Sequence, residues 1–410
     1  MSMRFKGGVI SATPPTITPP VDGEGGSASG VWTLQTQLQN AAIWPKPPIP
    51  KGLWSWGNNS AGQLGQNNTT YRSSPVQIGA LTTWAVFSVG GNQSFAISQN
   101  GALWGWGQGY FGQLGQNNTF DRSSPVQIGA LTNWAKVSSG DTSCFAIKTD
   151  GTLWSWGFNG SGRLGLNDTD NRSSPVQVGA LTNWAEVNAG GGSDTDLVLA
   201  VKTDGTMWSW GNNSHGRLGL NDTTSRSSPV QVGTLTNWRV PSVGTGCGIA
   251  LKTDGTMWSW GNNGNSRLGL GDTIARSSPV QIGALTDWAK ISAGFATCSA
   301  IKTDGTMWAW GYNAKGQLGL GDVAGRSSPV QVGALTTWAQ VSAGDKFCAA
   351  VKTDGTIWSW GINTFGRLGQ NNASIGYTFF DKSSPTQIGA LTTWLRPSVG
   401  KNRMIAAKTP

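Results

Sequence analysis

The sequence is poor in charged and catalytic side chains. Charged residues make up 12% of its 410 residues, against roughly 25% in a typical soluble protein. Histidine occurs once, at His215, and glutamate twice, at Glu24 and Glu186. Acid–base and hydrolytic enzymes need a positioned histidine or paired carboxylates, so we predict that the protein is not an enzyme.

The sequence also lacks the signatures of metal sites, export signals and membrane spans. Its cysteines form no CxxC pair, so no zinc site or other metal site is predicted. The N-terminus has no apolar segment of the secretory type, and no run approaches the length of a membrane span. We therefore expect synthesis in a cytosol, with no cofactor and no membrane insertion. The four cysteines, which we expect to be small buried groups, are Cys144, Cys247, Cys298 and Cys348.

Tryptophan and glycine, by contrast, are abundant and periodic. There are 23 tryptophans and 60 glycines, and the phrase Leu-Trp-Ser-Trp-Gly or a close variant occurs seven times. The step is 50 residues each time except once, where it is 54. A period of about 50 residues indicates a propeller, solenoid or array. The tryptophan pairs are Trp54/Trp56, Trp104/Trp106, Trp154/Trp156, Trp208/Trp210, Trp258/Trp260, Trp308/Trp310 and Trp358/Trp360.

One repeat shows what the unit is. Residues 134–138, 144–148, 152–156 and 176–178 read as four short strands. Asp150-Gly151 predicts a type I′ hairpin turn between the second and third strands. Pro175 introduces the fourth strand, which must be an edge strand because proline donates no backbone hydrogen bond. Four antiparallel strands repeated seven times predict an all-β, seven-bladed propeller.

The two ends of the repeat region complement each other. Residues 51–56 read as a third strand without its hairpin partner, and residues 404–408 as a second strand without its third. We predict that they pair in one composite blade and close the ring, which removes two exposed sheet edges. The recurring tryptophans, including a third set that follows Leu-Thr, are then expected to pack within and between blades.

The repeat resembles that of the regulator of chromosome condensation (RCC1) family. The resemblance is carried by Trp-Gly-x-Asn-x-x-Gly-(Gln/Arg)-Leu-Gly, as in residues 56–65 and 360–369, then Ser-Ser-Pro-Val and Lys-Thr-Asp-Gly-Thr-Leu-Trp. It covers residues 51–410 and implies a seven-bladed propeller, whose functions range from nucleotide exchange to plain binding. Family repeats usually carry Gly-x-x-His after the first strand. This chain has Gly90-Gly-Asn-Gln, Gly140-Asp-Thr-Ser and Gly344-Asp-Lys-Phe instead, which argues against inherited exchange activity.

The net charge of +9 does not indicate a nucleic-acid partner. Basic residues are spread around the repeats rather than gathered in one patch, as nucleic-acid binding requires. One basic residue per repeat precedes Ser-Ser-Pro, namely Arg72, Arg122, Arg172, Arg226, Arg276, Arg326 and Lys382.

Residues 1–50 differ in kind from the repeats and predict an extended anchoring arm. Residues 11–20 are proline-rich and extended, residues 21–30 are a Gly/Ser-rich linker, and residues 33–42 allow a short helix. Residues 27–34 and Trp44-Pro45 resemble the N-terminal attachment segment of tailed-bacteriophage virion structural and fibre proteins. That resemblance implies that the arm binds other virion proteins; the alternative is a disordered tail. The candidate anchoring residues are Phe5, Ile10, Ile17, Val31, Trp32 and Trp44.

Two insertions interrupt the repeat, and loops are where binding residues gather. In the first, Asp194 and Asp196 are candidates to bind a cation or sugar hydroxyls, or are simply solvated. In the second, Tyr377, Phe379 and Phe380 are candidates for a protein contact, or cover the joint beside the composite blade.

The leading functional hypothesis is a phage virion protein. A non-enzymatic propeller, made in the host cytoplasm and anchored by its arm, would serve as fibre, adhesin or decoration and bind a host receptor or glycan. Homo-oligomers on the particle are compatible with this hypothesis. One alternative is an RCC1-like cellular regulator that binds a small GTPase or chromatin; another is a carbohydrate-binding, lectin-like propeller. His215 occupies a loop position that holds Ala61, Phe111, Ser161 and Phe365 elsewhere, so we expect it to be solvated.

Overall fold

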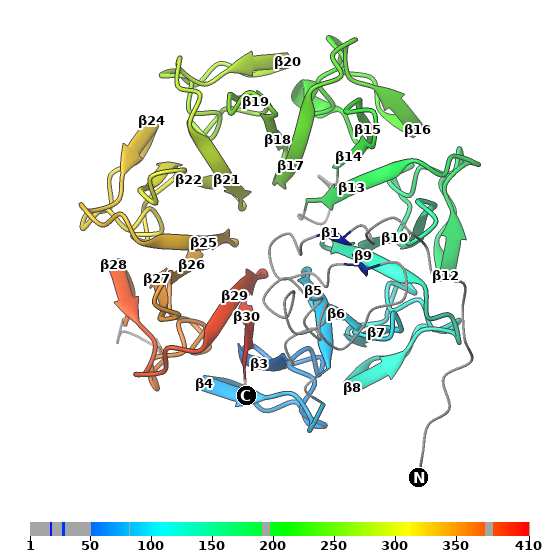
Figure 1. Ribbon diagram of the computed structural model, residues 1–410, viewed down its shortest axis with the longest axis horizontal. Helices are drawn as coiled ribbons and strands as arrows, with labels where there is room; N and C mark the ends of the chain where they lie inside the picture. Colours follow the sequence, from blue (N-terminus) through cyan, green and yellow to red (C-terminus); the bar gives the residue numbers. More distant parts are fainter. Residues whose placement is uncertain are drawn as a thin grey trace, which may run out of the picture. The chain divides into compact units, whose positions relative to one another are not determined.

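Seven four-stranded antiparallel sheets stand around a common axis in a computed structural model of the chain (Figure 1). The structure describes residues 17–18, 27–28, 51–81, 83–190, 197–373 and 380–409. By its internal contacts the chain divides into two units, residues 1–50 and 51–410. The predicted all-β, seven-bladed propeller with four strands per blade is confirmed.

Six blades are built from consecutive strands, with the first strand innermost and the fourth outermost. Blade 1 contains β5 (Trp84–Val89), β6 (Gln93–Ser98), β7 (Leu103–Gly107) and β8 (Arg122–Gln127). Blade 2 contains β9 (Trp134–Ser139), β10 (Ser143–Lys148), β11 (Leu153–Gly157) and β12 (Arg172–Gln177). Blade 3 contains β13 (Trp184–Ala189), β14 (Leu197–Lys202), β15 (Met207–Gly211) and β16 (Arg226–Gln231), with the short 3₁₀ helix η1 (Ser214–Gly216). Blade 4 contains β17 (Trp238–Gly244), β18 (Cys247–Lys252), β19 (Met257–Gly261) and β20 (Arg276–Gln281). Blade 5 contains β21 (Trp288–Ala293), β22 (Thr297–Lys302), β23 (Met307–Gly311) and β24 (Arg326–Gln331). Blade 6 contains β25 (Trp338–Ala343), β26 (Phe347–Lys352), β27 (Ile357–Gly361) and β28 (Lys382–Gln387).

The seventh blade joins the two ends of the repeat region. This closing blade has the order β29-β30-β3-β4, from β29 (Trp394–Val399), β30 (Arg403–Lys408), β3 (Gly52–Gly57) and β4 (Arg72–Gln77). Strands β3 and β30 pair antiparallel over their whole length, with Trp56 opposite Met404. The predicted closure of the ring by its terminal strands is therefore confirmed.

Local geometry corrects two details of the predicted repeat. The Asp-Gly hairpin forms, but within Lys148–Thr152 only Gly151 has a positive φ, of 75°. The turn is therefore not type I′: the loop has three residues, so one left-handed glycine closes it. The fourth strand begins at Arg172 rather than at residue 176. Pro175 lies inside that strand, which is tolerated because β12 is outermost and its outward side needs no partner.

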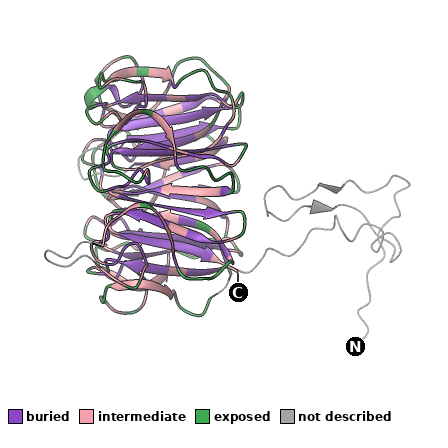
Figure 2. Cartoon of the chain, turned by 90° about the vertical axis from the view of Figure 1, so that its left-hand side faces the viewer, coloured by how far each residue is buried: buried purple, intermediate pink, exposed green. Residues whose placement is uncertain are grey.

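The hydrophobic core lies between blades rather than within them. One cluster packs Phe95 and Leu103 of blade 1 against Trp134, Cys144 and Trp156 of blade 2. The second tryptophan of every Trp-x-Trp pair is completely buried, and burying one such side chain contributes on the order of 2–3 kcal/mol. Figure 2 shows buried residues along the strands and exposed ones in the loops at both ends. The predicted structural role of the tryptophans is confirmed, and all four cysteines are buried.

Indole hydrogen bonds tie neighbouring blades at six of the seven joints. Trp156 Nε1, for example, donates to the Gln113 carbonyl of the preceding blade at 2.9 Å. At the joint that closes the ring, Trp56 Nε1 donates to the Arg367 carbonyl at 3.0 Å. The lysines of Lys-Thr-Asp-Gly sit over tryptophan rings, with Lys148 Nζ 3.6 Å from the Trp154 ring centroid, a cation–π contact.

Seven glycines meet around the axis and form what we call the glycine ring. A Cβ on Gly90 would lie 2.1 Å from the Gly140 carbonyl oxygen, and one on Gly294 would lie 2.2 Å from that of Gly344. The same relation runs around the whole circle, so each blade approaches the next at a distance that only glycine allows. The ring consists of Gly90, Gly140, Gly190, Gly244, Gly294, Gly344 and Gly400.

Within residues 1–50 the structure describes only two short strands. β1 (Ile17–Thr18) pairs antiparallel with β2 (Ser27–Ala28). Of the candidate anchoring residues, Ile17 belongs to β1. Phe5, Ile10, Val31, Trp32, Trp44 and the helix predicted at 33–42 lie outside the described residues. In the described part of the chain, no helix has the length and apolar character needed to cross a membrane.

We expect Gly294→Ala to lower the free energy of unfolding by about 2–3 kcal/mol, since its methyl group meets a backbone oxygen that belongs to another blade. Gly264→Ala is the matched control: its Cβ would meet only the Asn262 side chain, at 3.3 Å. Neither glycine has a positive φ, so the comparison isolates the steric effect. Urea denaturation measures both; equal stability of the two variants would contradict the role of the glycine ring.

Arg403 fastens the closing blade to blade 1. It is completely buried and donates to the Gly91 and Gln93 carbonyls at 2.5 and 2.6 Å. Burial lowers its pKa to about 9, so desolvation opposes these bonds. Arg403→Met removes that desolvation cost but also removes both hydrogen bonds, and the Gln93 carbonyl keeps only the Gly90 N–H as a donor, at 3.0 Å. We therefore expect a net loss of about 2–4 kcal/mol.

The exposed Arg239 supplies the control for this second prediction, and we expect Arg239→Met to melt like the unmodified protein. Thermal unfolding followed by circular dichroism compares them. Unchanged melting of Arg403→Met would show that this arginine does not hold the ring closed.

Candidate functional site

The ring has two chemically different ends. The first and third strands of each blade run in the same direction, so their C-terminal ends lie together. One end, the loop end, carries the loops that follow these strands, such as 90–92 and 107–121 in blade 1. The opposite end, the turn end, carries the Asp-Gly turns. Residue 51 enters the ring at the turn end, because β3 is a third strand.

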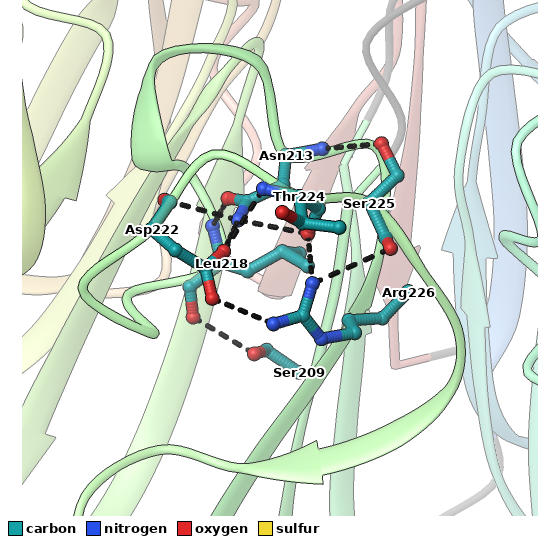
Figure 3. A network of polar contacts seen from close by, with 7 residues as sticks. All are labelled: Ser209, Asn213, Leu218, Asp222, Thr224, Ser225 and Arg226. Atoms are coloured by element: carbon teal, nitrogen blue, oxygen red, sulfur yellow. Dashed lines mark hydrogen bonds and ion pairs between the residues drawn. The ribbon is translucent and has the colours of Figure 1, made fainter.

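A buried asparagine holds the long loop at the loop end in six of the seven blades, as Figure 3 shows for blade 3; blade 1 has Gly109 at this position. Asn213 Nδ2 donates to the Asp222 carboxylate at 2.8 Å and to the Thr224 carbonyl at 3.0 Å. Its Oδ1 accepts the Leu218 N–H at 2.9 Å. Three parts of the loop are thereby fixed to one side chain that is 0% exposed.

An ion pair completes the loop frame in four consecutive blades. Arg226 Nη2 lies 2.6 Å from Asp222 Oδ2, and Thr224 N–H donates to the other carboxylate oxygen at 2.9 Å. The Thr224 N–H and then the Arg226 guanidinium hold the pKa of Asp222 below its ordinary value. The pairs of blades 2 to 5 are Asp168–Arg172, Asp222–Arg226, Asp272–Arg276 and Asp322–Arg326.

The other three blades, which are also consecutive, lack this ion pair. The aspartate is replaced by Asn372 in blade 6, Asn68 in the closing blade and Asn118 in blade 1. The leucine two positions earlier becomes glutamine in the same blades. Gln66 and Gln116 accept the Nε–H of Arg72 and Arg122 at 3.1 and 3.0 Å. A neutral glutamine side chain, instead of a carboxylate, thus positions Arg72 and Arg122.

Variation among the repeats is concentrated at the loop end. The turn end repeats Lys-Thr-Asp-Gly-Thr in five blades, and the asparagine of the loop frame recurs in six. Between the frame residues, several loop positions differ from blade to blade, including the following three. The first holds Ser60, Tyr110, Gly160, Ser214, Gly264, Ala314 and Thr364. The second holds Ala61, Phe111, Ser161, His215, Asn265, Lys315 and Phe365. The third holds Thr70, Phe120, Asp170, Thr224, Ile274 and Ala324 in the six loops of uniform length.

Aromatic side chains occupy these positions in neighbouring blades. Tyr110 and Phe111 pack with ring centroids 4.9 Å apart, and Phe111 lies 4.8 Å from Phe158 of blade 2. Tyr71 of the closing blade stacks edge-on against Phe365 of blade 6 at 5.1 Å. Exposed aromatic clusters of this kind mark recognition surfaces.

The central channel opens at the same end and encloses a cavity of about 320 Å³. A belt of hydroxyl and amide oxygens links six joints along it: Ser88 Oγ, for example, accepts the Ser139 N–H of the next blade at 3.0 Å. The mouth carries Asp141, Asp345 and Lys401. Burial raises the pKa of Asp345, opposed by nearby Lys346 and Arg367. The oxygens of this belt accept hydrogen bonds from backbone N–H groups of the neighbouring blades. We therefore interpret their role in the channel as structural.

The structure describes only some of the predicted binding residues. Asp194, Asp196, Tyr377 and Phe379 lie outside the described residues. The segments that contain them interrupt loops of the loop end, since they follow β13 and β27. Phe380 is partly buried, and His215 is exposed in η1 with φ of 65°, as a solvated loop residue would be. No group of three or more metal-ligating His, Cys, Asp or Glu side chains occurs among the residues that the structure describes.

Comparison with known families agrees with this geometry. The RCC1-like domain family matches residues 51–295, and the regulator of chromosome condensation (RCC1) repeat matches residues 304–351 and 354–403. The chain belongs to the RCC1-like domain family. No curated protein sequence is significantly similar to it.

Solved structures of this family share the fold of the chain at low sequence identity. Prp20p from Saccharomyces cerevisiae, described with its binding properties to Gsp1p and histones, is 20% identical with a TM-score of 0.76, covering 88% of this chain and 92% of its own. Human WBSCR16 is 18% identical with a TM-score of 0.76, covering 88% of this chain and 99% of its own. Identities this low establish the fold alone.

The positions where RCC1-like repeats usually place a histidine are packing positions in this chain. Gln93, Ser143 and Phe347 are all 0% exposed. Gln93 Nε2 donates to Ser139 Oγ and to the Gly140 carbonyl of the next blade, at 3.2 and 3.0 Å. Side chains at this position therefore hold blades together and do not face a ligand.

Sequence reasoning missed the residues that distinguish the two groups of blades. The signal was available, because Leu-Gly-Gln-Asn-Asn occurs in three repeats and Leu-Gly-Leu-Asn-Asp or Leu-Gly-Leu-Gly-Asp in four. Its meaning depends on the contact between Asp222 and Arg226, which lie four residues apart across the end of a loop.

Asp222→Asn should cost less than about 1 kcal/mol at neutral pH, because the ion pair is partly exposed and screened. Its native carboxyl has a pKa below its ordinary value of 3.8. The ion pair therefore stabilises the fold above that value, and its contribution disappears as the pH falls through the native pKa. Urea denaturation at neutral and at strongly acidic pH should show the two proteins converging in acid; a constant difference would contradict this.

Proposed function

We propose that the protein is a non-enzymatic recognition propeller that binds its partner with the loop end of the ring. The observation that carries the proposal is the distribution of variation among the repeats. A recurring frame of glycine, asparagine and arginine residues holds loop positions that differ from blade to blade. Rigid scaffolds with variable loops are a common design for binding.

The polarity of the ring supports display of that surface. Residue 51, which follows the arm, starts a strand at the turn end, whereas the variable loops lie at the opposite end. The polypeptide therefore enters the ring at the end opposite to the variable loops. The partner at the loop end would be a receptor or glycan on a host surface.

We further propose that the particle is a phage virion, with the arm bound to other virion proteins. The support for this is the sequence of residues 27–34 and Trp44-Pro45, similar to attachment segments of tailed-phage structural proteins. The family matches begin at residue 51 and do not include this arm. Membership of the RCC1-like family brings no histidine to the usual positions, so nucleotide exchange has no specific observation in its favour.

Immunogold labelling of purified phage particles tests the virion role. An antibody against the propeller should label intact particles, with pre-immune serum as the control. Substituting Trp32→Ala and Trp44→Ala in the full chain should remove the label from the particle. The same variant should melt like the unmodified protein, because both residues precede the ring. Unlabelled particles would refute the virion role without affecting the assignment of the binding surface.

A further inference from the structure

The loop end is divided into two sectors with different charge. We call blade 6, the closing blade and blade 1 the open sector, because their Arg72, Arg122 and Lys382 form no ion pair among the described residues. In blades 2 to 5 every equivalent arginine faces an aspartate. The open sector contains carboxylates of its own. Asp121 accepts the Gly109 N–H at 2.8 Å and Asp381 accepts the Asn363 N–H at 2.9 Å, both within the loops, and Asp345 lies at the mouth of the channel.

The free guanidinium nitrogens of the open sector correspond to those that bind carboxylates elsewhere. Arg226 Nη2 holds Asp222 Oδ2 at 2.6 Å in blade 3. Arg122 uses its Nε for Gln116 and its Nη1 for a backbone carbonyl. Its Nη2, like both terminal nitrogens of Arg72, makes no hydrogen bond within the described residues. The sector therefore presents carboxylate-binding groups without a carboxylate.

The most exposed aromatic rings belong to the same sector. Tyr110 is 69% exposed, Phe120 is 65% exposed and Tyr71 is 47% exposed, against 40% for Phe295 and 37% for Tyr312 of blade 5. The Arg122 guanidinium lies 5.8 Å from the Phe120 ring centroid, so a cation and an aromatic face stand side by side. In the closing blade Tyr71 immediately precedes Arg72 in the sequence, and its ring packs on Phe365 of blade 6. Two adjacent blades thus each carry an exposed ring and an uncompensated guanidinium close together in the sequence.

We propose that the open sector binds a glycan that bears carboxylate groups. An exposed aromatic ring stacks on the apolar face of a sugar, and a guanidinium pairs with a carboxylate through parallel hydrogen bonds. An exposed ring and an unpaired guanidinium in each of two successive blades match a polymer of repeating acidic sugars. The inference rests on the proposed role of the loop end as the recognition surface and names the chemistry of its partner.

Two other classes of acidic macromolecule fit less well. Nucleic acids carry a charge every few ångströms and are usually neutralised by many cations, whereas the loop frames of the sector offer one cation in each blade. A protein partner would bury a contiguous apolar patch. Here Tyr110 belongs to a small cluster with Phe111 and Phe158, and Phe120 lies beside the Arg122 guanidinium. Small aromatic surfaces next to unpaired cations suit a sugar chain.

Binding of alginate oligomers to the full-length protein, followed by isothermal titration calorimetry at low salt, tests the inference. Asn68→Asp with Asn118→Asp places carboxylates where the other blades have them. We expect this variant to lose affinity by about tenfold or more, since each site loses a charge-assisted contact. Tyr110→Ser with Phe120→Thr should also weaken binding. These replacements are the residues that the chain itself uses at Ser60, Ser214, Thr70 and Thr224.

The matched control adds the same charge at the same end of the ring, but in the opposite sector. Asn212→Asp with Asn262→Asp preserves the acceptors that receive the Ser214 and Gly264 N–H groups. We expect it to bind alginate as the unmodified protein does. Circular dichroism and thermal melting verify that each variant is folded before its affinity is compared.

Four results would overturn the inference. They are no alginate binding by the unmodified protein, an equal loss of affinity in the control, equal affinity for neutral dextran, and equal affinity for poly-glutamate, which would indicate an acidic protein partner. None of these results depends on particle labelling, so failure here is distinguishable from failure of the proposed function.

Discussion

Contact between neighbouring backbones at the axis is the constraint on which the propeller depends. Gly90, Gly294 and their equivalents approach the next blade so closely that no side chain fits between them. That approach sets the spacing at which indoles such as Trp156 reach the carbonyls of the preceding blade. Because the hydrophobic clusters straddle the joints, a change in spacing at the centre would be felt across every core. The regularity of the inner strands follows from this single geometric requirement.

The variable positions of the loop end do not belong to the glycine ring, so their residues can differ from blade to blade. Its frame is polar and local: Asn213 fixes its own loop through bonds to residues a few positions away. A substitution at Tyr110 or His215 therefore changes the surface without disturbing a joint. This separation explains how near-identical blades can carry an asymmetric surface, with the unpaired arginines and the most exposed aromatic rings in two adjacent blades. Chemistry specific to a partner can be placed on such a ring one loop at a time.

The fold could be predicted in detail because its causes are periodic. Trp-x-Trp pairs, Asp-Gly turns and the incomplete repeats at residues 51–56 and 404–408 determined blade number, strand count and closure. The prediction of a type I′ turn at Asp150-Gly151 was wrong, because a three-residue loop needs only Gly151 in the left-handed region. The site was harder to predict. That Asn118 leaves Arg122 without an ion partner is visible only when Asp222 is seen to bind Arg226. The significance of Asp194, Asp196, Tyr377 and Phe379, outside the described residues, stays a prediction.

The pairing of β3 with β30 has a consequence for biosynthesis. The first strand of the ring to be synthesised, β3, pairs with the last strand of the ring, β30, which is made some 350 residues later. At translation rates of about 5–20 residues per second, Leu53 and Trp56 lack that neighbour for tens of seconds. During this interval the growing chain exposes one unsatisfied sheet edge and an apolar face. A nascent chain of this kind needs protection from aggregation until its last strand emerges.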